Sequence, residues 1–249
     1  RNDGRNLIEE ARARGFTVVF TRAEMQALDP AKIGRVLGVF AAEHTFNDQS
    51  FRDNARDGKD SYEPDAPSVK EMMEFTLKVL ARDPDGFFLV AEEEGTDNFG
   101  NANNATGLIE ALRRADEAIA FGRDYVRRNP NTLLLVASDS DAGGFQLRGL
   151  LPSRYTAEGR ERVEMNEGNG APVHGREGRG SLPFFSAPDK TGKRWPVQAM
   201  FASPFDVSGG GLVRADGLNR ELVSGTLDNT DVYKVMYRTM FGTAPWETK

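Results

Sequence analysis

The stretch Leu133–Gly144, "LLLVASDSDAGG", decides how this sequence is interpreted. A run of aliphatic residues ends at Ser138-Asp139-Ser140-Asp141 and is followed directly by Ala142 and two glycines. This pattern is typical of a buried strand that delivers acidic side chains to a loop at its carboxyl end. The sequence therefore predicts either a metal site or an ordinary turn at this loop.

Strands and helices alternate on both sides of this stretch. Residues 86–91, "GFFLVA", form a second apolar run, and apolar residues recur at helical spacing between residues 102 and 128. A strand, a long helix and a strand in this order predict a βαβ unit with parallel strands buried on both faces, and hence an α/β fold. Further strands are expected at 16–20, 35–41 and 196–201, and further helices at 7–14, from Thr21, at 68–82 and at 228–241. Thr21 with Glu24 and Ser68 with Glu71 have the spacing of a capping box.

Two segments lack any periodicity. Residues 43–67 are polar and irregular, and they are expected to form an excursion over the surface. Residues 145–193 are rich in Gly, Arg, Glu and Pro and hold too few apolar residues for a core of their own. They are predicted to form an insertion or crown-like subdomain within a single α/β domain that covers residues 1–249.

Composition excludes several classes of protein. The chain has 249 residues and a net charge of -6, with no cluster of Lys and Arg, so a nucleic acid is not an expected partner. The absence of cysteine excludes disulfides and thiolate metal ligands. No apolar run approaches the roughly 18 residues that a transmembrane helix needs. The sequence therefore predicts a folded protein without a transmembrane segment.

Acidic residues follow two of the predicted strands. Glu92, Glu93, Glu94 and Asp97 come after residues 86–91, as Asp139 follows Leu133–Ala137. The carboxyl ends of parallel strands meet at one edge of a sheet, where grouped carboxylates repel one another unless a proton or cation intervenes. A hard divalent ion would suit such a group. The alternative is that Glu92–Glu94 is a solvated loop and that Asp139 caps a turn.

The sequence around these residues resembles a known family. The stretch 86–112, "GFFLVAEEEGTDNFGNANNATGLIEAL", followed by 131–144, "NTLLLVASDSDAGG", resembles the central motifs of the alkaline phosphatases. Residues 1–28, 34–44 and 224–236 also resemble that family in order and spacing. The resemblance implies a three-layer sandwich with a mostly parallel central sheet, of which this chain would form the carboxyl-terminal part.

The resemblance assigns metal ligands to three carboxylates of this chain. In the family, a Glu at the end of a strand helps to hold magnesium, an Asp five residues later binds one zinc ion, and a later Asp binds a second zinc ion. These positions are occupied here by Glu92, Asp97 and Asp139. The resemblance therefore implies a metal site with carboxylate ligands.

The histidine ligands of the family are replaced in this sequence. The matching positions hold Asn101, Ser140 and Lys190. Oxygen ligands suit magnesium better than zinc, so magnesium is the expected ion. Lys190 would carry a positive charge at a former metal or substrate position, where it would either replace the electrostatic role of the ion or exclude the ion. His44 and His174, the two histidines of the chain, are expected to be ordinary surface residues; the alternative is that either is recruited to the site.

Two functions are compatible with these observations. In the family, the nucleophilic Ser or Thr precedes the matched region, so we expect this chain to be part of a longer protein or to pair with a second chain. The first function is metal-dependent hydrolysis of phosphate monoesters by a homodimer that is periplasmic or secreted, as the resemblance implies. The second is a binding or structural role in a relative that has lost catalysis.

Overall fold

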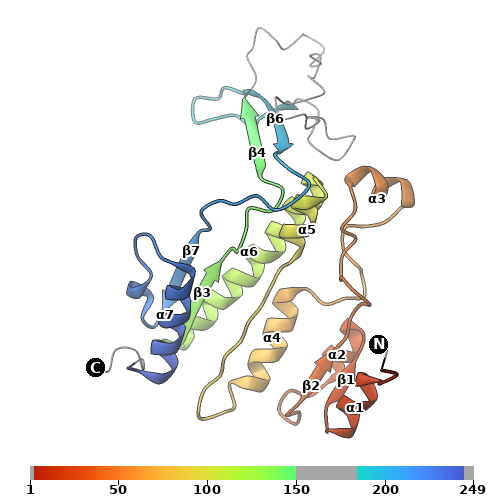
Figure 1. Ribbon diagram of the computed structural model, residues 1–249, viewed down its shortest axis with the longest axis vertical. Coiled ribbons are helices and arrows are strands. Elements are labelled where there is room, and N and C mark those ends of the chain that lie inside the picture. The colour runs from red at the N-terminus through yellow and green to blue at the C-terminus, as the bar shows by residue number, and fades with distance from the viewer. Residues whose placement is uncertain (1–2, 150–183, 244–249) are drawn as a thin grey trace. The chain divides into compact units, whose positions relative to one another are not determined.

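The computed structural model describes residues 3–149 and 184–243 of the chain (Figure 1). The chain divides into two compact units, of which unit 1 comprises residues 1–115 and 142–207, and unit 2 comprises residues 116–141 and 208–249. The expectation of a single domain over residues 1–249 stays a prediction. Most of the predicted insertion at 145–193 lies outside the described residues.

Unit 1 contains most of the helices and two small sheets. Its helices are α1 (Leu7–Ala13), α2 (Arg22–Ala27), α3 (Phe51–Asp57), α4 (Val69–Leu80), α5 (Gly95–Asn101) and the first half of α6 (Ala105–Arg128). Its strands are β1 (Thr17–Val19), β2 (Val36–Gly38), β4 (Phe145–Gly149), β5 (Phe184–Phe185) and β6 (Pro196–Phe201). β1 pairs with β2 in parallel, whereas β6 pairs antiparallel with both β4 and β5. The predicted capping boxes at the starts of α2 and α4 are confirmed.

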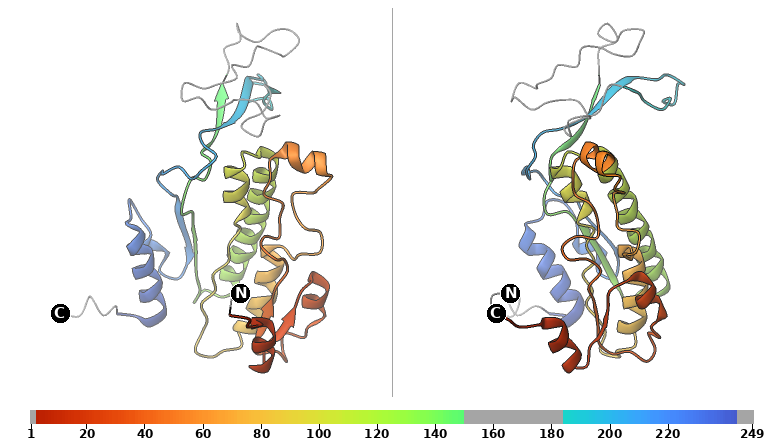
Figure 2. Two further views of the ribbon diagram at one scale, coloured as in Figure 1. Left: turned by 45° about the vertical axis from the view of Figure 1, so that its right-hand side comes forward. Right: turned by 90° about the vertical axis from the view of Figure 1, so that its right-hand side faces the viewer.

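Unit 2 is built around one antiparallel pair of strands. It contains the rest of α6, β3 (Leu133–Ala137), β7 (Val213–Gly217), the short 3-10 helix η3 (Arg220–Leu222) and α7 (Asn229–Phe241). β3 pairs with β7 so that Leu135 lies opposite Ala215. The long paired strands of each unit, β4 with β6 and β3 with β7, can be followed in Figure 2. The helix expected at 228–241 is confirmed as α7, with Asp228 as its N-cap.

The predicted βαβ unit is wrong. Residues 86–91 form no strand, and β3 pairs antiparallel with β7 instead of in parallel with residues 86–91. A strand needs a hydrogen-bonding neighbour, and no strand is described beside residues 86–91. No described neighbouring strand covers this segment, and the side chains of Phe88 and Val90 are 55% and 73% exposed. The described residues accordingly contain small sheets and no central parallel sheet.

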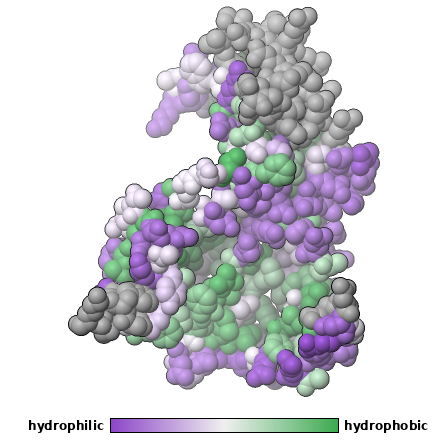
Figure 3. Space-filling model, viewed as in Figure 1, coloured by the Kyte–Doolittle hydropathy of each residue, from purple (hydrophilic) through white to green (hydrophobic). Residues whose placement is uncertain are grey.

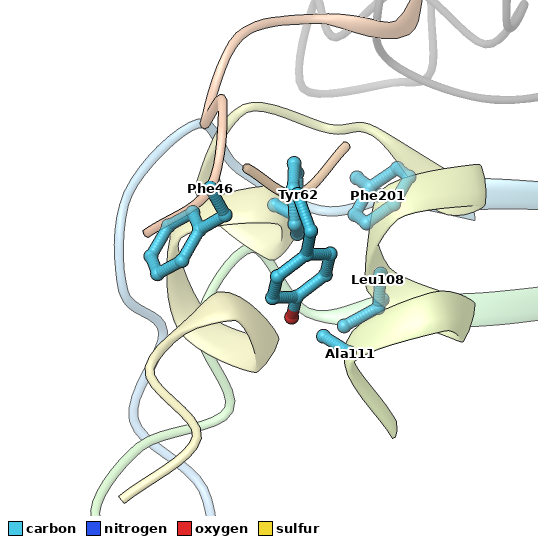
Figure 4. Packing of buried hydrophobic residues seen from close by; sticks show 6 residues of the cluster. Phe46, Tyr62, Leu108, Ala111 and Phe201 are labelled. Atoms are coloured by element: carbon cyan, nitrogen blue, oxygen red, sulfur yellow. The ribbon is translucent and has the colours of Figure 1, made fainter. Parts of the chain in front are cut away.

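The core of unit 1 is an aromatic cluster. It consists of Phe46, Tyr62, Phe99, Leu108, Ala111 and Phe201, all of them buried (Figure 4). The ring of Phe99 is completely buried and lies 5.4 Å from the ring of Phe46 and 5.9 Å from that of Tyr62. Aromatic burial of this size is a major source of stability in a small core. The cluster joins the polar segment 43–67 to α5 and α6.

The surface of unit 1 is uneven in its polarity. The segment 43–67, expected to be irregular, contains the helix α3, whose surface is hydrophilic in Figure 3. Apolar atoms are exposed around α4 in the same view. A short helix of mostly polar residues leaves no periodic apolar face in the sequence, which is why α3 was not expected.

Three backbone segments of unit 1 meet where glycine leaves room for close contact. The carbonyl oxygen of Gly143 accepts hydrogen bonds from the backbone N–H groups of Ala202 and Ser203, and that of Ala142 accepts one from Val207 at 2.8 Å. A Cβ atom at Gly143 would collide with the carbonyl oxygen of Gly100 and would lie 2.9 Å from that of Ser203. We call this contact of Gly100, Gly143 and Ser203 the glycine joint.

The glycine joint gives a test of the packing of unit 1. Gly143→Ala is expected to lower the free energy of unfolding by about 1–3 kcal/mol or more, because the backbone atoms around Gly143 cannot move aside as a flexible side chain can. Gly34→Ala is the matched control, since a Cβ atom there meets nothing within 4 Å. Denaturant unfolding of both variants measures the difference, and equal stabilities would contradict the close contact.

Candidate functional site

The predicted site residue Glu92 lies at the edge of a pocket in unit 1. The pocket has a volume of about 170 Å³ and is bounded by the Glu43–Phe46 segment, the start of α4, the Glu92–Glu94 segment and Arg114 of α6. Glu92 and Glu94 are exposed, whereas Glu93 is half-buried. The three consecutive glutamates therefore do not form one solvated loop, because the middle one points into the protein.

Glu93 belongs to a polar group beneath the pocket. The Tyr62 hydroxyl donates a hydrogen bond of 2.7 Å to Oε1 of Glu93, and the Arg114 guanidinium lies 3.6 Å from the centroid of the Tyr62 ring. Arg114 also lies 3.9 Å from Glu110, one turn earlier on α6. A cation over an aromatic face is attracted to the ring, so Arg114 holds the Tyr62 ring in place while the hydroxyl orients Glu93.

Burial shifts the protonation of both partners. Burial raises the pKa of Glu93 above its ordinary value, against the opposing effects of the Tyr62 hydrogen bond and the Arg114 charge. The pKa of Tyr62 is raised far above its ordinary value, first by burial and then by the hydrogen bond to Glu93. Tyr62 therefore stays a hydrogen-bond donor, and Glu93 keeps its proton to a higher pH than a solvated glutamate does.

His44 lies among carboxylates beside the same pocket. Its ring stacks on Phe46 with centroids 4.9 Å apart, and its Nδ1 lies 3.5 Å from Glu94. Its Nε2 lies 3.4 Å from the side-chain amide of Asn98 and 3.9 Å from Asp48. His44 is thus partly buried and packed, in contrast to the surface residue that we expected. His174 lies outside the described residues.

The predicted ligands Asp97 and Asn101 come together on α5. They are four residues apart, and Nδ2 of Asn101 donates a hydrogen bond of 2.9 Å to Oδ1 of Asp97. The same Nδ2 donates a second hydrogen bond of 2.7 Å to Oδ1 of Asp206, from the segment that follows β6. Oδ1 of Asn101 is buried and has no hydrogen-bond partner among the described residues. Asp206 was missed in the sequence because no local pattern connects it to α5.

Two further asparagines were also missed. Asn103 has a left-handed backbone conformation, with φ 54°, and its side-chain amide donates to the carbonyl oxygens of Gly100 and Ser203. Asn104 accepts a hydrogen bond from the backbone N–H of Gly107 and donates one to the carbonyl oxygen of Gln49. The signal was present in the sequence, since Asn before an apolar helical pattern is a preferred N-cap residue.

Asp139 and Ser140 lie in unit 2, in the loop that follows β3. Asp139 is exposed and Ser140 is half-buried. The loop runs close to a glycine run at 209–211, because a Cβ atom at Gly209 would collide with the Asp141 carboxylate and one at Gly211 would lie 2.8 Å from the carbonyl oxygen of Ser138. The predicted strand and acidic loop are confirmed as structural features, and their role as ligands stays a prediction.

Lys190 lies in a tight turn of unit 1. The turn is closed by Asp189, whose carboxylate accepts hydrogen bonds from the backbone and side chain of Thr191, from the backbone of Lys193 and from the indole of Trp195. These hydrogen bonds, led by that of the Thr191 hydroxyl, lower the pKa of Asp189 well below its ordinary value. Lys190 itself is exposed. Asp97 and Asn101 are thus the members of the predicted set that hydrogen bonding brings together.

Comparison with solved structures shows the class of fold. The Thermus thermophilus alkaline phosphatase superposes with a TM-score of 0.70 at 23% sequence identity, covering 98% of this chain and 60% of that chain. The alkaline phosphatase of the Antarctic bacterium TAB5 superposes with a TM-score of 0.64 at 17% identity, covering 98% of this chain and 57% of that one. Nearly the whole of this chain therefore corresponds to part of the α/β fold of these proteins.

The sequence then assigns the family. The profile of the alkaline phosphatases matches residues 1–241, so the chain belongs to the alkaline phosphatase family, whose members are metal-dependent phosphomonoesterases. Members of the family are often extracellular or periplasmic. Among the described residues, no helix is both long and apolar enough to cross a membrane.

The curated relatives that this chain matches are longer than the chain. Alkaline phosphatase 3 of Bacillus subtilis (strain 168) is 29% identical over 143 residues, which are 57% of this chain and 28% of that protein. The repressible alkaline phosphatase of Saccharomyces cerevisiae is 28% identical over 151 residues, 58% of this chain and 26% of that protein. The chain thus matches less than a third of the length of each.

The residues present do not fit zinc at the Asp97–Asn101 position. Zinc favours imidazole or thiolate donors, whereas this position offers two carboxylates and the N–H groups of an amide, which cannot bind a cation. No group of three or more His, Asp or Glu side chains in the described part of the chain is arranged to hold a metal ion. Oxygen donors such as Glu92 and Asp139 fit magnesium in their chemistry.

A double-mutant cycle tests the buried pair of Tyr62 and Glu93. Tyr62→Phe is expected to lower the free energy of unfolding by about 1–3 kcal/mol, because it leaves a half-buried carboxyl group without its hydroxyl donor. In a Glu93→Gln background the same substitution is expected to cost less, since a neutral amide is cheaper to leave unpaired. Additive effects of the two substitutions would contradict a coupling between the Tyr62 hydroxyl and the carboxyl group of Glu93.

The raised pKa of Glu93 predicts a dependence of stability on pH. Because the folded protein holds the proton of Glu93 more tightly than the unfolded chain does, the associated stabilisation is complete below the ordinary pKa of 4.5 and is lost as pH rises through the folded value. The stability of Glu93→Gln relative to the original protein should therefore increase as pH rises from about 4 to about 8. Urea unfolding across this range measures it, and a constant difference would contradict the raised pKa.

Proposed function

We propose that the protein hydrolyses phosphate monoesters as a member of the alkaline phosphatase family and that this chain supplies the carboxyl-terminal part of the fold. The match of the family profile to residues 1–241 is the observation that carries the proposal. The carboxylates of Glu92, beside a pocket, and of Asp139, after a strand, support it, since both are exposed and the sequence resemblance assigns metal ions to both positions.

Magnesium is the proposed ion. We propose Glu92 and Asp139 as separate carboxylate ligands, each available to solvent. A divalent ion at such a position neutralises negative charge on a phosphoryl oxygen. This set of metal ligands is smaller than the one expected from the sequence. It leaves out Asn101, whose side chain presents N–H groups and not its oxygen to Asp97. Ser140 stays a proposed neighbour of the ion at Asp139.

The remaining parts of the proposal concern the whole protein. The nucleophile is proposed to lie in the part of the family fold that this chain does not match, because the nucleophilic Ser or Thr of the family precedes the region that this chain resembles. The chain covers 60% of the Thermus thermophilus structure. Lys190 is proposed as a positive group for the substrate phosphate, consistent with its exposure. Homodimer formation and a periplasmic or secreted location complete the proposal.

A catalytically degenerate family member with a binding or structural role is the second candidate. The observation that favours it is the hydrogen bonding of Asn101 to two carboxylates, because the sequence resemblance assigns a metal ligand to this position. The two candidates differ in whether the native protein contains stoichiometric metal and turns over a phosphate ester.

The first experiment is hydrolysis of p-nitrophenyl phosphate by the native protein, in the form in which it occurs, with added magnesium, manganese, calcium or zinc. Turnover is expected with magnesium, together with stoichiometric metal by elemental analysis. Asp139→Ala is expected to reduce kcat/KM by roughly 100-fold or more, because it removes a proposed metal ligand.

Asp116→Ala is the matched control for this measurement. Asp116 is an exposed carboxylate on α6 of the same unit as Asp139, so its removal is expected to leave the rate unchanged. Native protein that is folded, metal-free and inactive with every ion would refute the hydrolase proposal and leave the degenerate family member.

A further inference from the structure

Asn101 occupies the position to which the sequence resemblance assigns a zinc ligand, yet its side chain donates hydrogen bonds to two carboxylates. Its Nδ2 lies 2.9 Å from Oδ1 of Asp97 and 2.7 Å from Oδ1 of Asp206, which are both ordinary lengths for a charge-assisted hydrogen bond. Two negative groups converge on one neutral NH₂ group that has two N–H bonds to offer. Each N–H bond therefore has one carboxylate partner.

The other end of the amide decides which way Asn101 points. Its Oδ1 is buried without a hydrogen-bond partner among the described residues. Turning the amide over would aim its oxygen at two carboxylate oxygens, and both hydrogen bonds would be lost. Acceptors that face one another repel, so the hydrogen-bond network itself fixes the orientation of the amide.

The surrounding backbone supports a structural role for this position. Asn103, two residues after Asn101, donates to the carbonyl oxygen of Ser203 at 2.7 Å, and the backbone N–H of Val207 donates to the carbonyl oxygen of Ala142. Asp206 thus lies in a segment that is held against α5 and the 142–144 turn by contacts other than its own. These contacts bring the carboxylate of Asp206 to Asn101.

We infer that Asn101 replaces a metal ion with a hydrogen-bonded bridge between Asp97 and Asp206, and that Asp206 is the partner that makes this bridge possible. A divalent cation would join two carboxylates by neutralising them, and the amide joins them by donating one N–H bond to each. The bridge fastens α5 to the segment after β6 in the absence of metal. The inference rests on the family membership of the chain and not on its proposed catalytic activity.

The test compares thermal unfolding of the native protein and its variants with EDTA, with magnesium and with zinc. Asn101→Asp puts a third carboxylate where the amide stood, so the bridge becomes a cluster of repelling charges. Its Tm is expected to fall by roughly 5 °C or more in EDTA and to recover with a divalent ion. Asp206→Asn is expected to lower Tm by less and to show no recovery, because it makes one charged hydrogen-bond acceptor neutral and creates no excess charge.

The double variant Asn101→Asp with Asp206→Asn keeps the net charge of the original protein. It exchanges donor and acceptor in the hydrogen bond between positions 101 and 206. It is expected to recover part of the Tm that Asn101→Asp loses in EDTA, because the new amide at 206 can donate to the carboxylate at 101. Asp116→Asn, an exposed carboxylate on α6, is the control and should leave Tm unchanged.

Two results would overturn the inference. One is a rise in Tm of the original protein with magnesium or zinc that Asp206→Asn abolishes, since this would place a metal ion between the two carboxylates. The other is an Asn101→Asp variant with unchanged Tm in EDTA. Because the measurement is stability, an inactive protein would refute the proposed hydrolase function and leave this test intact.

Discussion

The burial of Phe99 is the constraint on which the rest of unit 1 depends. Its ring is completely buried against Phe46 and Tyr62 and lies so close to α6 that a Cβ atom at Gly107 would collide with it. A helix of seven residues such as α5 has little stability of its own, so packing fixes its position and rotation. Phe99 lies midway between Asp97 and Asn101, and its burial therefore sets the direction in which both face.

The contacts of α5 and of the other helices show which features the sequence could predict and which it could not. The family resemblance grouped Asp97 with Asn101, and the capping boxes marked the starts of α2 and α4 correctly. Local patterns carry this information because the interacting groups are one helical turn apart. Asp206 is separated from Asn101 by 105 residues, so no local pattern could connect them.

The predicted strand at 86–91 shows the converse limit. Its apolar sequence is suited to a strand, but the ladder of a sheet belongs to two segments, and the apolar run identifies only one of them. The parallel pairing expected for Leu133–Ala137 was wrong for the same reason, since β7 is too rich in polar residues to stand out as its neighbour. The run Glu92–Glu94 was likewise ambiguous, because only packing against Tyr62 distinguishes Glu93 from the residues on either side.

The long sequence separation of Asn101 and Asp206 has a consequence for the order of folding. Contacts within α5 and α6 close small loops, whereas the contact between Asn101 and Asp206 requires a loop of more than a hundred residues to close first, at a greater cost in chain entropy. We expect this contact to form after the rate-limiting step. An interaction that is absent from the transition state slows unfolding more than it speeds folding, so the amide prolongs the lifetime of the native chain.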